Sequence, residues 1–158
     1  MKRIFVLLVG VSLVVPVFAV GKGKAKYMGG SSPGVKDGTE GPIDLKDAGS
    51  LYWQADNGNE GRISFAWSAV TEMEYGQKVS RRWRSAILLS PLALFSKARK
   101  HFMTIAYKDA LNKEQAVVFE FDKDGIRQAM AILKARTGKQ IAMQDEEAEK
   151  QMGGAGKK

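Results

Sequence analysis

The sequence predicts a mainly β domain of the α+β class: an antiparallel open barrel or sandwich of about six to seven strands, capped by one C-terminal α-helix. Two patterns carry this prediction. Between Ser50 and Phe121, short segments alternate apolar and polar residues and are separated by turn residues. From Asp122 onward, apolar residues recur instead at helical spacing. Successive strands followed by a single helix are typical of a sheet that the helix covers on one side or end.

The strands are predicted from their alternation. Residues 62–67 place Ile63, Phe65 and Trp67 on one face, which indicates a half-buried strand. Asn57 and Gly58, just before it, are a hairpin signal. A helical turn over residues 92–97 follows the break that Pro91 makes in the apolar stretch. The predicted strands are residues 50–56, 62–67, 69–76, 84–90, 101–108 and 115–121.

The C-terminal helix is predicted over residues 122–139. Ile126, Met130 and Leu133 follow one another at i, i+4 and i+7, which is the spacing of one helix face. Asp122 or Asp124 can cap the first turn, Lys134 and Arg136 suit the last turn, and Gly138 suits the position after it.

The first 19 residues have the composition of a secretory signal. Lys2 and Arg3 precede an almost wholly apolar run, and Ala19 ends a pattern that signal peptidase reads. We therefore expect an exported protein, periplasmic or extracellular after cleavage of residues 1–19. The alternative is an uncleaved N-terminal membrane anchor, because three lysines close behind the run oppose translocation: Lys22, Lys24 and Lys26.

The chain of 158 residues is long enough for one domain with a core. Residues 20–41 are rich in Gly, Ser, Lys and Pro and are expected to be a flexible linker. The domain is expected over 42–138, and residues 139–158 as a partly helical or disordered tail. The absence of cysteine excludes disulfides, thiolate nucleophiles and cysteine-ligated metals.

The order of elements and the segments "GRISFAW" and "VTEMEYG" resemble a pleckstrin-homology-like domain, over about residues 43–138. The resemblance implies a scaffold that binds phosphoinositide head groups or peptides, normally without catalysis. Lipid-binding members carry a basic motif around the first hairpin loop. Here that loop, residues 56–60, is acidic, so phosphoinositide recognition does not carry over.

No motif in the sequence predicts catalysis, a metal site or a cofactor. Residues 56–61 suggest a calcium loop, but Gly58 and Trp67 stand where oxygen ligands are needed. His101 is the only histidine, and no G-x-S-x-G motif is present. A hydrolase using His101 or carboxylates remains the alternative from another class, and its candidate carboxylates are Glu72, Glu74 and Glu120.

Residues 77–108 contain no acidic side chain, in a protein whose formal net charge is +8. Within this window we predict an anion- or lipid-binding site that consists of Arg81, Arg82, Arg84, Lys97, Arg99 and Lys100. Apolar anchors are expected beside it, at Trp83, Leu92, Leu94 and Phe95. The competing interpretation makes the apolar residues part of the core and the charges a solvated rim.

The sequence thus predicts an exported, non-enzymatic binding module. Its expected partner is an anionic lipid surface or an acidic protein or peptide, without nucleic acid, and a homo- or hetero-oligomer is compatible with it. The alternative is a structural or adaptor subunit of an envelope complex, joined to another chain by strand-edge pairing.

Overall fold

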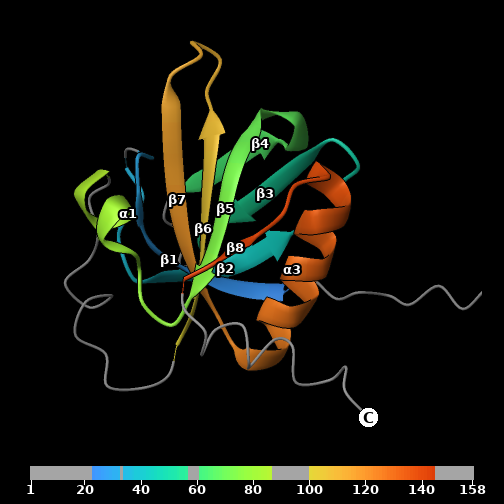
Figure 1. Ribbon diagram of the computed structural model, residues 1–158. Helices are drawn as coiled ribbons and strands as arrows, with labels where there is room; N and C mark the ends of the chain where they lie inside the picture. The colour runs from blue at the N-terminus through green and yellow to red at the C-terminus, as the bar shows by residue number, and fades with distance from the viewer. Residues whose placement is uncertain (1–22, 33, 57–60, 87–99, 145–158) are drawn as a thin grey trace, which may run out of the picture.

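The structure, a computed structural model, describes residues 23–32, 34–56, 61–86 and 100–144, and its strands form one eight-stranded sheet (Figure 1). The expectation of a mainly β protein with a C-terminal helix is confirmed. The strands are β1 Gly23–Gly30, β2 Thr39–Asp44, β3 Ser50–Gln54, β4 Arg62–Ala66, β5 Val70–Gly76, β6 His101–Lys108, β7 Glu114–Phe121 and β8 Ala142–Met143.

The strand order is β4-β3-β2-β1-β7-β6-β5-β8. Strands β1 to β4 form one antiparallel meander, and strands β5 to β7 form another. Antiparallel pairing of β1 with β7 joins the two meanders, and β8 pairs in parallel with β5. Because β4 and β8 stand at opposite ends of this order, the sheet does not close into a barrel.

Strand β1 corrects the prediction of a flexible linker over residues 20–41. It lies in the interior of the sheet, between β2 and β7. Ala25 and Tyr27 point into the core and are 2% and 1% exposed, while Lys24 lies on the outer face. The glycines and lysines that suggest flexibility thus belong to a strand whose apolar residues are few but alternate. The folded domain begins well before Pro42.

Strand β2 continues this correction, and its Gly41 lies close to the backbone of Gln54 and Ala55 at the end of β3. A methyl group on Gly41 would overlap the backbone carbonyl oxygen of Gln54 and would lie 3.2 Å from Cα of Ala55. A side chain at this position would therefore push the two strands apart, which explains the glycine within the strand.

Five of the six strands predicted after Ser50 are confirmed, with shifts of at most two residues at their ends, and the exception is the strand predicted over residues 84–90. Ile63 and Phe65 of β4 are buried, and the residues between them are exposed, as the alternation requires. A short 3₁₀ helix, η1 Trp67–Ala69, leads from β4 to β5. The hairpin signal at Asn57 and Gly58 lies outside the described residues.

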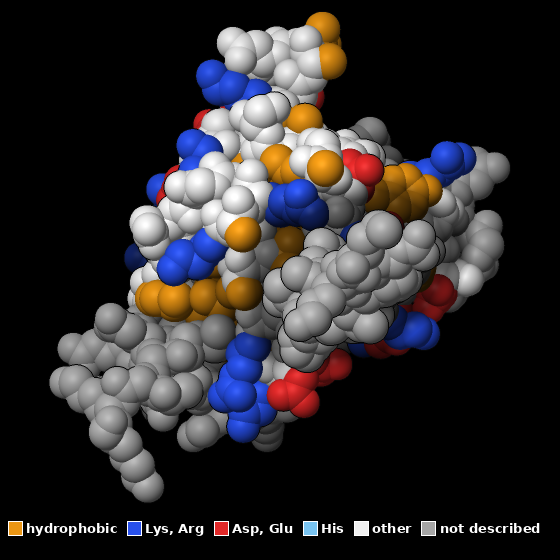
Figure 2. Space-filling model, turned by 90° about the vertical axis from the view of Figure 1, so that its right-hand side faces the viewer, with side chains coloured by type: hydrophobic (Ala, Val, Ile, Leu, Met, Phe, Trp, Pro, Cys, Tyr) orange, Lys and Arg blue, Asp and Glu red, His pale blue; other side chains and the backbone are white. Residues whose placement is uncertain are grey.

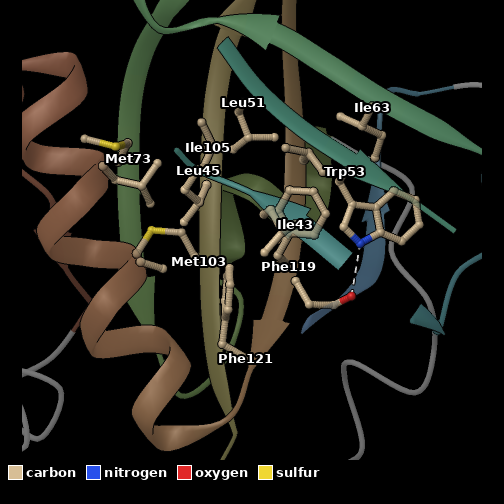
Figure 3. Packing of buried hydrophobic residues seen from close by; sticks show 14 of the residues in the cluster. Ile43, Leu45, Leu51, Trp53, Ile63, Met73, Met103, Ile105, Phe119 and Phe121 are labelled. Atoms are coloured by element: carbon tan, nitrogen blue, oxygen red, sulfur yellow. Dashed lines mark hydrogen bonds between the residues drawn. The ribbon is translucent and has the colours of Figure 1, made fainter. Parts of the chain in front are cut away.

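The main core lies between the inner face of the bent sheet and helix α3 Lys123–Thr137 (Figures 1 and 3). Trp53 is at its centre with no exposed surface, and its indole nitrogen donates to the backbone oxygen of Ala25 at 3.0 Å. Tyr27 and Phe119 contact the Trp53 ring at centroid distances of 6.0 and 5.9 Å.

Helix α3 confirms the sequence prediction in its bounds, caps and buried face. The carboxylate of Asp122 accepts a hydrogen bond from the amide of Gly125, as an N-cap does. Gly138 has φ +66° and ends the helix in the left-handed conformation that glycine favours. The residues that α3 buries are Ile126, Ala129, Met130 and Leu133.

A second, smaller core lies on the outer face of the sheet, under helix α1 Arg81–Ala86. Figure 1 shows α1 and α3 on opposite sides of the sheet. Residues 84–86 belong to this helix, so the prediction of a strand over residues 84–90 is wrong for them. Residues 87–90 lie outside the described residues. An extended segment would not cover the apolar outer face that Met28, Phe102 and Val118 form.

After α3 the chain returns to the sheet. Ile141 is buried in the main core, and the amide of Gln144 donates to the backbone oxygen of Tyr75 at 2.9 Å. Residues 139–144 are therefore neither helical nor detached, in contrast to the predicted tail, while 145–158 lie outside the described residues. None of the helices in the described ranges has the length and apolarity to cross a bilayer.

Candidate functional site

The arginines of α1 are the first part of the predicted basic site. Arg81, Arg82 and Arg84 are all exposed on the outer side of the helix. The guanidinium of Arg82 forms an ion pair with the carboxylate of Glu72 on β5 and also lies 4.6 Å from the centroid of the Trp83 ring. Glu72 raises the pKa of Arg82, so the positive charge of Arg82 is already engaged within the protein.

Trp83 is not the exposed apolar anchor that the sequence predicts. It is 6% exposed and packs in the second core with Val79 and Phe102. The reason is that β6 is buried on both faces, so the outer face of the sheet needs an apolar cover. Trp83 provides that cover and fixes the α1 arginines in place.

Lys100 is also engaged within the protein. Its ammonium group lies 2.8 Å from the carboxylate of Glu120 on β7, and both side chains are largely buried. The remaining predicted residues lie outside the described part of the chain: Lys97, Arg99, Leu92, Leu94 and Phe95. Two of the four described basic residues of the predicted site, Arg82 and Lys100, are thus held by carboxylates.

A further group of basic residues lies on α3, outside the site predicted from the sequence. Lys123, Arg127 and Lys134 are exposed, and at 3.6 residues per turn their side chains fall within about 40° of one another around the helix axis. We call these three residues the α3 basic face. None of the ion pairs within the described residues involves them.

The α3 side of the molecule carries further positive charge. Figure 2 views the molecule from this side and shows blue Lys and Arg side chains spread across it. Arg136 is exposed near the end of the helix and donates to the backbone oxygen of Lys46 at 2.7 Å. The signal that could have found the basic face is the spacing of Lys123, Arg127 and Lys134, four and seven residues apart.

His101 begins β6 and lies next to this side of the molecule. It is 9% exposed, its Nδ1 lies 2.7 Å from the Tyr75 hydroxyl oxygen, and the two rings stack with centroids 6.0 Å apart. Burial lowers the pKa of His101, and the charges of Lys123 and Arg127 lower it further. No group of three or more His, Cys, Asp or Glu side chains within the described residues could hold a metal ion.

The lowered pKa of His101 predicts a pH-dependent stability. Below about pH 6.5 the unfolded chain takes up a proton on the imidazole that the folded chain resists. The free energy of unfolding should therefore fall as the pH drops through 6.5, down to the folded-state pKa. Urea titrations at a series of pH values measure this slope. His101→Gln should flatten it, since the chain has no other histidine; an unchanged slope contradicts the assignment.

Two cavities are lined by described residues. One cavity of about 30 Å³ lies between α3 and β2, lined by Ile43, Leu45 and Ala129 among others, and it has room for about one water molecule. A more open hollow of about 280 Å³ lies on the outer face of β1 and is lined by Lys24, Lys26, Glu40 and Glu120. Lys26 and Glu40 pair across it at 2.9 Å.

No protein-family model and no curated protein sequence matches this chain.

Proposed function

We propose that the protein is a non-enzymatic binding module of pleckstrin-homology-like architecture that contacts an acidic protein surface through the α3 basic face. The architecture is supported by two antiparallel meanders of four and three strands, joined through β1 and β7, with a C-terminal helix packed on the inner face. Export, expected from residues 1–19, is part of the proposal.

The observation that carries the proposed function is the alignment of three unpaired cations on one face of one helix. Other cations, for example Lys26, Arg82 and Lys100, have a carboxylate within ion-pair distance. The α3 basic face has none among the described residues. Unpaired cations aligned on a rigid helix attract an acidic partner without first breaking an internal ion pair.

A protein surface is favoured over a lipid surface. Membrane binding by a basic face is strengthened by apolar side chains that enter the lipid interface. Trp83, one of the anchors expected for that role, is buried in the second core. Arg81 and Arg84 on α1 are exposed on the opposite side of the sheet, so they form a separate contact and do not extend the α3 basic face.

The test uses a fluorescently labelled polyglutamate peptide as the acidic probe, with binding followed by anisotropy at low and moderate salt. The variant Lys123→Gln/Arg127→Gln/Lys134→Gln should bind at least about tenfold more weakly than the wild type, because it loses three attractive charges. Raising the salt concentration should weaken wild-type binding much more than binding by the variant.

The matched control removes three charges elsewhere. Lys36, Lys108 and Lys113 are exposed and lie away from α3, so replacing them with glutamine changes the net charge equally. If the control loses as much affinity as the α3 variant, general charge and not the α3 basic face causes binding. Binding to anionic vesicles that exceeds binding to polyglutamate would instead favour the lipid surface.

A further inference from the structure

The outer edge of β4 has backbone groups that no described strand pairs with. The amide of Trp67 donates to the oxygen of Gly49, and the amide of Ala55 donates to the oxygen of Gly61, each at 3.0 Å. In an antiparallel ladder, every second residue points both its amide and its carbonyl toward the neighbouring strand. Gly61, Ile63, Phe65 and Trp67 therefore face β3.

The residues between them face the other way. The amides of Arg62 and Ser64 and their carbonyls point away from β3, toward the end of the sheet. Within the described residues, no other strand pairs with β4. The side chains of Arg62 and Ser64 are exposed, so the outer face beside this edge is open as well.

The two edges of the sheet differ in how well they are protected from pairing with another strand. At one end the chain places β8 on β5, so Glu74 and Tyr75 have partners. At the other end β4 has no proline and no bulge, and it pairs with β3 over five residues without a register shift. Natural sheets usually protect an exposed edge with proline, a bulge or a covering segment. A regular edge without this protection can act as a template for another strand.

We propose that the β4 edge binds an extended, acidic segment of another protein as an added antiparallel strand. Backbone hydrogen bonds to Arg62 and Ser64 would supply the pairing, and side chains on the outer face would supply the selectivity. This edge is a different surface from the α3 basic face, and the inference does not depend on the function proposed for that face.

Charge identifies the kind of segment. Strands β3 and β4 contain no Asp or Glu, and Arg62 is the one charged residue in them. An acidic side chain on the added strand would lie next to Arg62 in a cross-strand pair. Tyr52 is 37% exposed and lies opposite Ser64, so the outer face beside this edge also has an aromatic side chain and no acidic one.

A second copy of this chain fits the edge less well. Two copies each carry a formal charge of +8 and would repel each other. An acidic segment on the same edge is attracted instead of repelled.

The experiment follows amide hydrogen exchange by NMR in the full chain, with an end-blocked octapeptide of alternating valine and glutamate as the probe. We expect the amides of Arg62 and Ser64 to exchange at least about tenfold more slowly when the peptide is saturating. A peptide of alternating valine and lysine should give no protection. Protection that appears without peptide, as the protein concentration rises, would indicate self-pairing and overturn the proposal.

Substitution of Ser64 separates backbone pairing from side-chain contact. Ser64→Pro removes the outward amide without breaking the ladder to β3, so peptide binding should fall at least about tenfold. Ser64→Ala keeps the amide and should bind as the wild type does. Equal binding by the proline and alanine variants would overturn the proposal.

Arg62→Glu provides a second test should Ser64→Pro fail to fold, because Arg62 is exposed and outside the core. This variant should lose affinity for the glutamate peptide and gain affinity for the lysine peptide. Unchanged preference would contradict the role of Arg62. The α3 variant Lys123→Gln/Arg127→Gln/Lys134→Gln should retain the protection at Arg62 and Ser64.

Discussion

Replacing Gly41 with alanine is expected to lower the free energy of unfolding by about 3 kcal/mol, the upper range for forcing extra volume into a packed site. The added methyl group would overlap the carbonyl oxygen of Gln54, which is backbone and cannot rotate away. Strands β2 and β3 would have to separate where Ile43 and Trp53 pair across them. Chemical denaturation followed by tryptophan fluorescence measures the loss.

The control for this substitution is Gly23→Ala on the neighbouring strand. A methyl group there would lie 3.6 Å from a methyl carbon of Ile43, an ordinary contact distance. We expect a change within about 0.5 kcal/mol for Gly23→Ala, because nothing has to move. If the two variants lose similar stability, the strands do not approach as closely at Gly41 as the structure indicates.

Helix α3 could be predicted completely because its determinants are local. The apolar spacing, the Asp122 cap and the Gly138 terminus all lie within the helix or next to it. The alternation of β4 and the apolar run of β7 are equally local, and the predicted ends of both strands are within one residue of the observed ends. The α3 basic face is nevertheless absent from the predicted site, because Lys123, Arg127 and Lys134 lie outside the acid-free window of residues 77–108 on which that prediction depends.

Strand β1 could not be predicted because its stability comes from distant residues. Its own sequence is rich in glycine and lysine, and Tyr27 pairs with Phe119, more than ninety positions along the chain. Alternation of Ala25 and Tyr27 with lysines was the available signal, but the glycines around it favour a linker. Burial of β1 depends on strand order, which composition does not determine.

The surroundings of the predicted basic site could not be predicted for a similar reason. Strand register decides which carboxylates reach the basic residues: Glu72 faces Arg82, and Glu120 faces Lys100. The sequence shows an acid-free window but not the acids that the sheet brings beside it. The burial of Trp83 had a visible signal, since β6 is apolar on both faces over most of its length and such a strand needs cover on both sides.

Removing the indole of Trp53 is expected to have the largest effect on the fold. Trp53→Ala deletes a fully buried side chain between Tyr27 and Phe119 and leaves the backbone oxygen of Ala25 without its donor. Large-to-small substitution of a core tryptophan costs about 3–5 kcal/mol, and a buried acceptor without a partner adds about 1–3 kcal/mol. A domain of typical stability loses most or all of its folded population at that cost.

Two further variants divide this effect into its parts. Trp53→Phe keeps most of the packing but not the donor, so its loss should be intermediate between wild type and Trp53→Ala. Tyr52→Ala changes the residue before Trp53, whose side chain points outward and is 37% exposed. It should lower the free energy of unfolding much less. Thermal unfolding followed by circular dichroism compares all three. A larger loss at Tyr52 than at Trp53 would show that β3 has the opposite face toward the core, because a shift of one residue exchanges the two faces of a strand.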